Sequence, residues 1–225
     1  MTLTQALTVT ERWSVFADLS AFKGNSRTWS ASVPIVNTDT IKLAPGFTVV
    51  YNGDRGTSRG QIQAVFADST NNIFDFERDI NLITGSFYGD YTLGSNRSLV
   101  ASAAFQSTDQ QLLPGDLLFQ IGGPLTVRGY PSDGIAGDKG YYGSLEFHQK
   151  NFLNISFLDG YVFTDLGAVY STFPEKTTLA SVGAGVNYDF KNNNRFEMTA
   201  AFPLLDSLNN QSSFVFYAGL TFKGL

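Results

Sequence analysis

The chain has 225 residues, of which 43% are hydrophobic, and it contains 22 Gly, 20 Phe and 10 Tyr but no Cys. Its formal net charge of -5 offers no basic surface to a phosphate backbone, which excludes nucleic acid as a partner. The absence of cysteine excludes disulfides and thiolate metal sites.

Alternation of apolar and polar residues predicts a series of β-strands and no convincing helix. The first ten residues already alternate like a strand. Further strands are predicted over 12–22, 28–36 (weaker), 41–51, 59–68, 80–92, 98–107, 140–150, 158–170, 179–190, 195–203 and 213–222. The predicted fold class is therefore all-β, with roughly ten or eleven antiparallel strands.

The predicted connections alternate in length along the chain. Short turns are expected near 52–57, 94–96, 151–154 and 191–194, and longer loops near 69–79, 108–139, 171–178 and 204–212. Outer-membrane barrels have short periplasmic turns and longer extracellular loops. No run approaches the roughly 18 apolar residues of a transmembrane helix, whereas a barrel strand needs only about 10 residues per crossing.

The two faces of the predicted strands differ in a way that suits a transmembrane β-barrel. In 195–203, Phe196, Met198, Ala200 and Phe202 alternate with Arg195, Glu197 and Thr199. A charge facing lipid at the midplane costs about 2–4 kcal/mol, so Glu146 and Asp165 are predicted to face the lumen. The alternative is a soluble β-sandwich or lipocalin-like barrel, whose strands alternate similarly.

One arginine lies among glycines inside the longest predicted connection. It occurs in the run Ile121-Gly122-Gly123-Pro124-Leu125-Thr126-Val127-Arg128-Gly129-Tyr130, which is followed by Gly137-Asp138-Lys139-Gly140. A buried arginine needs an acidic partner. Asp165, within Phe163-Thr164-Asp165-Leu166-Gly167, lies in an otherwise strand-like stretch and is the candidate partner. The alternative is that Arg128 is a solvated loop residue and Asp165 a lumen residue without a specific partner.

These spaced motifs resemble the two-partner secretion transporters (TpsB, the hemolysin secretion/activation family) of the BamA-type outer-membrane superfamily. The resemblance runs from the approach Leu113-Pro114-Gly115-Asp116 through Gly122-Gly123, Val127-Arg128-Gly129-Tyr130, Gly137-Asp138-x-Gly140 and Ser144-Leu145-Glu146 to Phe163-x-Asp165-x-Gly167. It implies that the loop over about 108–139 folds into the lumen. Arg128 then matches the tip arginine and Asp165 its inner-wall partner, with Glu146 as a second acidic neighbour.

The resemblance also implies what the chain is part of and what it does. Residues 1–225 look like the C-terminal part of a barrel of about sixteen strands, with periplasmic POTRA domains expected upstream and Phe222 in the place of the C-terminal strand signal. The implied function is an outer-membrane pore that secretes an unfolded exoprotein of the hemolysin or adhesin type. The alternative is a barrel-assembly factor of the BamA type.

Enzymatic chemistry finds little support in the sequence. The Gly-x-Ser-x-Gly pattern of a nucleophile elbow occurs at Gly56-Thr57-Ser58-Arg59-Gly60. However, no helix is predicted after Ser58, and the only histidine, His148, is predicted on a distant strand. The acidic residues Asp133 and Asp138 lack the ligand spacing of an EF-hand. We therefore expect no enzyme activity, no cofactor and no metal.

Overall fold

A computed structural model describes residues 1–132, 135–171, 174–190, 194–208 and 211–222. These residues form one 11-stranded antiparallel sheet in the order β1-β2-β3-β4-β5-β6-β9-β10-β11-β12-β13, and a small two-stranded sheet, β7-β8. The strands of the large sheet are β1 (Thr2–Val9), β2 (Trp13–Ser30), β3 (Val33–Gly53), β4 (Gly56–Asn71), β5 (Phe76–Gly94), β6 (Arg97–Ser107), β9 (Lys139–Lys150), β10 (Leu158–Tyr170), β11 (Lys176–Phe190), β12 (Asn194–Pro203) and β13 (Val215–Thr221).

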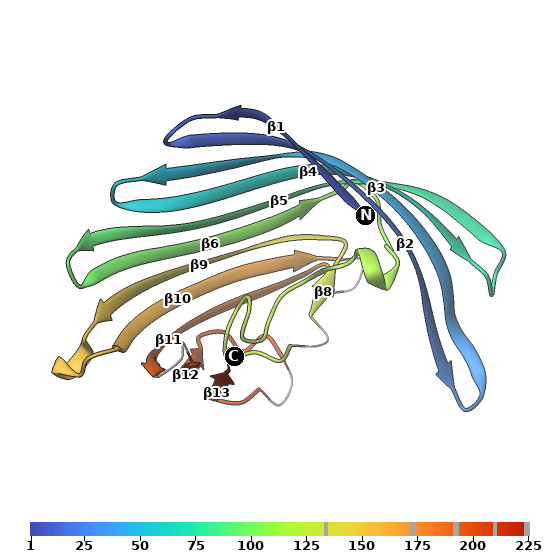
Figure 1. Cartoon of the computed structure of the whole chain (residues 1–225). Helices are drawn as coiled ribbons and strands as arrows, with labels where there is room; N and C mark the ends of the chain where they lie inside the picture. Colours follow the sequence, from blue (N-terminus) through green and yellow to red (C-terminus); the bar gives the residue numbers. More distant parts are fainter. Residues whose placement is uncertain (133–134, 172–173, 191–193, 209–210, 223–225) are drawn as a thin grey trace.

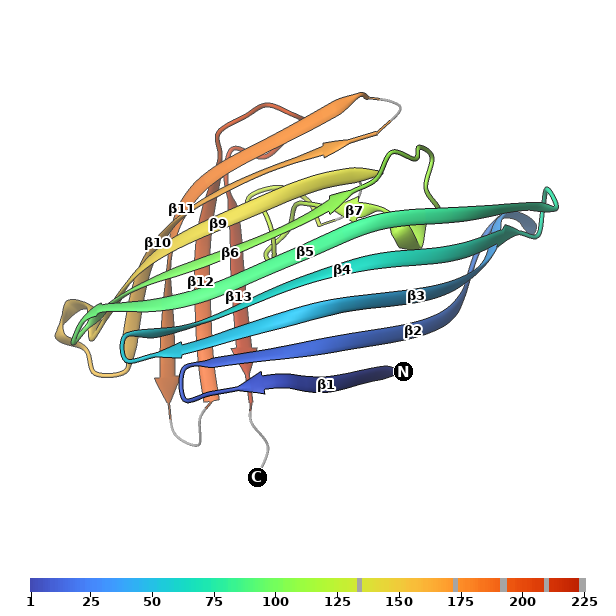
Figure 2. The same ribbon diagram turned by 90° about the horizontal axis from the view of Figure 1, so that it is seen from above.

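The large sheet curls into an open arch, and the connection between β6 and β9 lies under its concave face (Figure 1). This connection contains a short 3-10 helix, η1 (Gly115–Leu117), and the strands β7 (Phe119–Gln120) and β8 (Ala136–Gly137). Seen from above, β1 to β6 run side by side while β11 to β13 turn away across them (Figure 2). The prediction of an antiparallel all-β fold with about eleven strands is confirmed.

Two details of the predicted connections are wrong. The weak strand over 28–36 is a hairpin, since β2 ends at Ser30, Ala31 and Ser32 turn with positive φ, and β3 begins at Val33. The long loop over 69–79 is also a tight turn, since β4 continues to Asn71 and β5 begins at Phe76. In the second hairpin, polar residues occupy both faces at the strand ends, so apolar alternation fails there although the hydrogen-bonded ladder continues; they are Ser69, Thr70 and Asn71 of β4 and Glu77, Arg78 and Asp79 of β5.

Other predicted connections agree with the structure only in part. The turn expected at 151–154 is longer, because β9 ends at Lys150, a 3-10 helix η2 (Phe152–Asn154) follows, and β10 begins at Leu158. The longest connection, between β6 and β9, is in the predicted place. The acidic residue Asp133 lies outside the described residues, and so does the turn predicted at 191–194 except for its last residue.

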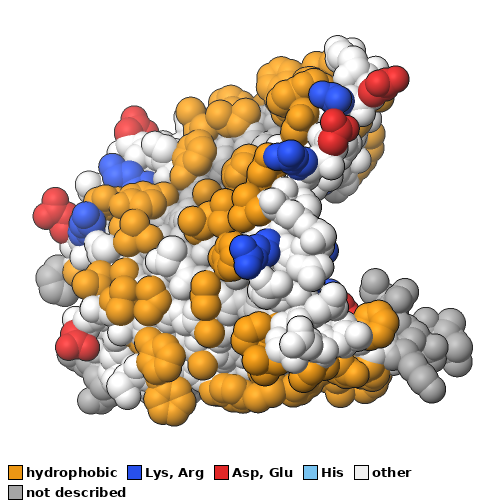
Figure 3. All heavy atoms as spheres, turned by 90° about the vertical axis from the view of Figure 1, so that its left-hand side faces the viewer, with side chains coloured by type: hydrophobic (Ala, Val, Ile, Leu, Met, Phe, Trp, Pro, Cys, Tyr) orange, Lys and Arg blue, Asp and Glu red, His pale blue; other side chains and the backbone are white. Residues whose placement is uncertain are grey.

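The convex face of the sheet is apolar and the concave face is polar or covered by the loop. Exposed hydrophobic side chains such as Leu145, Phe147, Val162, Leu166 and Phe202 point outward. Figure 3 shows hydrophobic side chains over much of the visible face, with fewer charged ones between them. Across the described residues, no helix has the length and apolar character that crossing a membrane requires.

Two apolar clusters hold the loop against the concave face. Near the loop's start, Leu113 and Leu117 pack with Ala44, Val65, Ala67, Ile80 and Leu82 of β3, β4 and β5. Near its tip, Ile121, Val127, Tyr130 and Ile135 pack with Val169 of β10 and Leu179 of β11. The loop therefore crosses the interior of the arch from one group of strands to another.

Candidate functional site

The candidate site is the contact between the loop tip and the inner wall formed by β9 and β10. The register of these strands pairs Phe163 with Glu146 and Asp165 with Ser144. All four side chains share the inward face, because side chains in a strand alternate with a period of two. Phe163 and Asp165 are buried beneath the loop. The register therefore creates a small acidic patch before the loop contributes anything.

Arg128 lies on this patch and uses most of its donors there. Its Nε donates to Asp165 Oδ2 at 2.8 Å and its Nη2 to Asp165 Oδ1 at 2.8 Å. Nη1 donates to Glu146 Oε1 at 2.5 Å, and Nη2 also donates to Ser144 Oγ at 3.0 Å. The backbone N–H of Arg128 adds a further bond to Asp165 Oδ2. The paired bonds from one guanidinium to one carboxylate are the strong, geometrically specific kind.

The ion cluster is withdrawn from solvent. Arg128 is 8% exposed and Asp165 1%. The guanidinium carbon also lies 3.5 Å from the centroid of the Phe163 ring, which adds a cation–π contact. Burial alone would lower the pKa of Arg128, but the hydrogen bonds and charges of Asp165 and Glu146 outweigh it and raise the pKa. Arg128 is therefore cationic in this site.

The two residues after Arg128 fix the tip from the other side. Gly129 has φ +91, a conformation that L side chains rarely adopt, and it lies against Pro203 of β12. Tyr130 is 1% exposed, and its hydroxyl donates toward the carbonyls of Ala180 and Leu205 and accepts from the N–H of Leu205. The tip is thus held between the β9–β10 wall and the β11–β12 end of the sheet.

The remaining motif residues near the tip support the approach of the loop to the wall. Val127 is fully buried against Gly167, where an added Cβ would come within 3.0 Å of the Val127 side chain. Gly122 accepts a hydrogen bond from the Thr126 hydroxyl, and Gly123 donates one to the Tyr130 carbonyl. These bonds close the loop on itself around the tip.

The Gly137-Asp138-x-Gly140 part of the motif lies at the other end of the loop. Gly137 belongs to β8 and Gly140 to β9. The Asp138 carboxylate accepts from the N–H of Leu113 at 2.8 Å, and its carbonyl accepts from the side chain of Gln106. Asp138 therefore ties the start of the loop to its end.

Three further residues complete the site, although no contact at the loop tip was predicted for them. Ser144 is a direct partner of Arg128. His148 bridges the Glu146 and Asp159 carboxylates at 2.9 and 2.8 Å, which extends the polar chain along the wall. The Tyr217 hydroxyl of β13 accepts from the N–H of Gly129 at 3.0 Å. The alternation of side chains along each strand indicates that these three residues face inward. It does not indicate which residue each of them contacts.

Two further expectations concern residues away from the tip. Phe222 directly follows β13 and is 68% exposed, and its role as the C-terminal strand signal stays a prediction. Throughout the described ranges, no group of three or more His, Cys, Asp or Glu side chains could hold a metal ion. His148, with Glu146 and Asp159 on its two ring nitrogens, instead forms part of an ion-pair chain.

Comparison with known proteins identifies families and structures that this chain resembles. The family model for haemolysin secretion/activation protein ShlB/FhaC/HecB matches residues 42–188. Among solved structures, the chain is similar to CdiB from Acinetobacter baumannii at 16% sequence identity and a TM-score of 0.81, covering 97% of this chain and 40% of that chain. It is also similar to CdiB from Escherichia coli at 17% identity and a TM-score of 0.79, covering 97% and 44%.

The chain thus spans less than half the length of these two CdiB chains. At these identities, the likeness establishes the fold alone, an antiparallel β-barrel wall. A search of curated proteins found no match.

Proposed function

The chain belongs to the haemolysin secretion/activation protein family ShlB/FhaC/HecB, and from this membership we propose that it forms part of the wall of a polypeptide-secreting pore. Members of this family are outer-membrane transporters of two-partner secretion in Gram-negative bacteria. The family is one of protein transporters, not of enzymes. Membership favours secretion over the alternative of a barrel-assembly factor.

The observation that carries the proposal is the docking of Arg128 on Asp165, Glu146 and Ser144 inside the arch. The loop that carries it crosses the concave side and would obstruct a polypeptide at this level (Figure 1). A tip held by directional polar contacts can leave the wall if other groups satisfy the same donors and acceptors. We propose that Arg128 controls how the loop occupies the lumen during transport.

The partners of the complete protein follow from the same proposal. The transported partner is an unfolded exoprotein of the hemolysin or adhesin type. The convex apolar face, with Leu145, Phe147 and Val162 exposed, suits contact with membrane lipid. Periplasmic POTRA domains would precede the barrel and receive the exoprotein. No nucleotide, metal or other cofactor is part of the proposed mechanism.

Arg128→Ala in the complete protein tests the proposal. Secreted exoprotein in the medium should fall while the amount of the variant in the outer membrane stays unchanged. Arg12→Ala is the matched control, because Arg12 makes an exposed pair with Asp54 on a turn far from the loop. Unchanged secretion by an inserted Arg128→Ala variant would remove the proposed role.

A charge exchange separates the pairing from a general effect of lost charge. Arg128→Asp combined with Asp165→Arg should recover part of the secretion that each single change removes, because the two side chains face each other. The geometry around Glu146 and Ser144 favours arginine on the loop, so recovery will be partial. A double variant no better than the worse single variant would contradict the pairing as the basis of the effect.

A further inference from the structure

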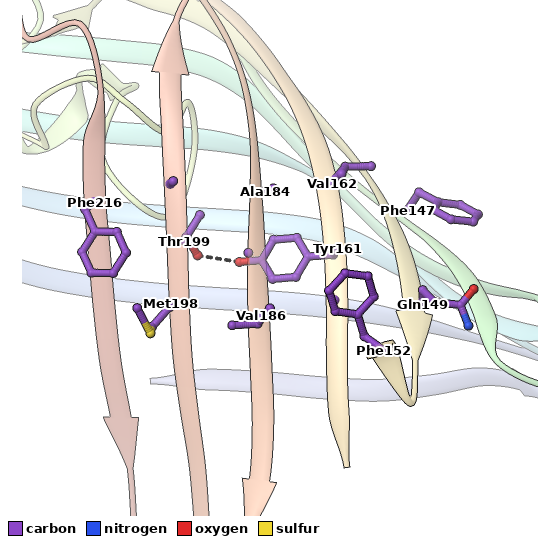
Figure 4. Close-up of a pocket in the computed structure, with 13 residues that line it drawn as sticks. Phe147, Gln149, Phe152, Tyr161, Val162, Ala184, Val186, Met198, Thr199 and Phe216 are labelled. Atoms are coloured by element: carbon purple, nitrogen blue, oxygen red, sulfur yellow. Dashed lines mark hydrogen bonds between the residues drawn. The ribbon is translucent and has the colours of Figure 1, made fainter. Parts of the chain in front are cut away.

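The outward face of the sheet carries an apolar groove that takes no part in the proposed transport mechanism. It crosses β9 to β13 near the β9–β10 turn and has a volume of about 560 Å³ (Figure 4). The ion cluster around Arg128 lies on the opposite face of the same strands. The groove is therefore a separate feature that faces the surroundings of the barrel.

The strand register explains why the wall is hollow at this place. One row of paired residues crosses five strands, and its side chains face outward. In order across the sheet they are Phe147, Val162, Ala184, Ala200 and Phe216. The third and fourth positions are alanines, and the two ends are phenylalanines. Small side chains in adjacent strands lower the floor, and the rings at each end form the sides (Figure 4).

The next row toward the β9–β10 turn closes one end of the groove. Gln149, Gly160, Val186 and Met198 pair in that row. The ring of Phe152, from the 3-10 helix η2, lies directly over Gly160, where an added Cβ would come within 2.7 Å of the ring. Phe152 thus forms the end wall, and Gln149 is one of the few polar groups along the lining.

The inner side of the wall is sealed beneath the groove. The Tyr161 ring covers Gly185 on the lumen side, and its hydroxyl is hydrogen-bonded to the Thr199 hydroxyl at 2.5 Å. Figure 4 shows this bond crossing from β10 to β12 over β11. An occupant can therefore enter only from the outward side, which the outer membrane surrounds.

A positive charge lies at the polar end of the groove. Arg97 of β6 pairs in register with Gln149, and its Nε donates to Gln149 Oε1 at 3.0 Å. Over the described residues, no carboxylate forms a salt bridge with Arg97. The remaining guanidinium donors suit the oxygen atoms of a phosphate group.

We propose that this groove binds one phospholipid, with an acyl chain along the Val162–Ala184–Ala200 row and the phosphate at Arg97. The apolar trough matches the acyl chain of such a molecule, and the cation at its end matches the phosphate. A polypeptide segment fits less well, because the backbone groups of the floor are already paired within the sheet and offer no partners to another backbone.

The test is retention of phospholipid by the complete protein. The protein is reconstituted in vesicles of phosphatidylethanolamine and phosphatidylglycerol, extracted in mild detergent, and weighed intact by native mass spectrometry. We expect one retained phospholipid per chain. Ala184→Phe should fill the groove and abolish retention, whereas Ala103→Phe, on the outward face of β6 away from the groove, should leave it unchanged.

A second pair of variants tests the phosphate contact without filling the groove. Arg97→Gln should lower retention about fivefold, as expected for one basic residue at a membrane surface. Arg12→Gln, at the same end of the sheet but paired with Asp54, should have no such effect. The proposal is overturned if no phospholipid is retained, or if the retained mass is that of a polypeptide. It is also overturned if the control variants Ala103→Phe and Arg12→Gln lower retention as much as Ala184→Phe and Arg97→Gln do.

Discussion

The loop between β6 and β9 is attached to the concave wall at its start and at its tip, and the two attachments differ in chemistry. At its start, Leu113 and Leu117 enter an apolar cluster with residues of β3, β4 and β5. At its tip, Arg128 enters an ion cluster with Asp165 and Glu146 of β10 and β9. Both regions also bury apolar side chains, because Val127 and Tyr130 of the tip pack with Val169 and Leu179, so the buried ion cluster is what distinguishes the tip from the start.

The difference shows how each attachment responds to change. Apolar burial is non-directional and roughly proportional to area, so the start of the loop tolerates changes that keep volume and hydrophobicity. The tip depends on several donors meeting several acceptors in one geometry, and losing one member leaves a buried charge unpaired. We infer that the start serves as a permanent anchor and the tip as the part that can be released.

The largest expected effect is at the tip. Asp165→Asn removes the charge that faces Arg128 in a buried site and should cost about 3–5 kcal/mol of docking free energy. The loop tip should then be cut by protease about a hundredfold faster or more, since cleavage follows the open population. Protease digestion of the protein in detergent measures this rate. An unchanged rate, equal to that of an Asp54→Asn control on the surface, would contradict the comparison.

The stability of the apolar attachment at the start of the loop should depend on the volume of the side chain at position 117, and not on which apolar side chain fills it. Leu117→Ala leaves a cavity in the apolar cluster and should cost about 2–5 kcal/mol, whereas Leu117→Met should cost less than about 1.5 kcal/mol. Chemical denaturation monitored by protease access to the start of the loop measures both. If Leu117→Met were as damaging as Leu117→Ala, the start would not be a tolerant apolar anchor.

The same reasoning predicts intolerance of conservative change at the tip. Arg128→Lys keeps the charge but loses the forked geometry that reaches Asp165, Glu146 and Ser144 together. Tip release should then resemble that of Asp165→Asn in direction, although it will be smaller because the charge remains. Protease cleavage of both variants under identical conditions gives the comparison. Wild-type resistance in Arg128→Lys would show that charge alone holds the tip.

The hydroxyl of Tyr130 should have a smaller effect. Tyr130→Phe keeps the buried ring and removes the hydrogen bonds to the backbone of Ala180 and Leu205, at a cost of about 1–3 kcal/mol. Hydrogen exchange at the N–H of Leu205, which donates to this hydroxyl, is the direct measurement. Unaltered exchange there would mean that water replaces the hydroxyl without loss.

The smallest expected effect concerns the contact with β13. Tyr217→Phe removes one hydrogen bond from the N–H of Gly129 and should cost about 0.5–1.5 kcal/mol. Tip cleavage should rise by no more than about tenfold. A larger increase, matching that of Asp165→Asn, would place the main attachment of the tip on β13 and not on the β9–β10 wall.

The strands were predictable where apolar and polar residues alternate. The segment 158–170 was predicted with the bounds that β10 has, because its outward Val162 and Leu166 alternate with inward Phe163 and Asp165. The segment 69–79 was predicted as a loop, yet Asn71, the last residue of β4, pairs with Phe76, the first residue of β5. Backbone hydrogen bonds hold that hairpin, and side-chain periodicity does not report on them.

The candidate site was predictable in its members but not in its connections. Asp165 was identified by its motif and inward alternation, and the structure brings it to Arg128, 37 residues away in sequence. Asp138, which belongs to the same motif series, instead binds Leu113 at the start of the loop. Spacing along a chain shows which residues belong together in a pattern, whereas the path of the loop decides which of them meet.

By itself, the sequence determined the all-β class and the faces of most strands, because the alternation of side chains is a local property with a period of two residues. Only the tertiary structure decided that Arg128 shares Glu146 with His148, and that Ala184 and Ala200 align between two phenylalanines to form a groove. These contacts depend on the register between strands and on the route of the loop. Both are set by packing and hydrogen bonding between distant segments, which local periodicity does not specify.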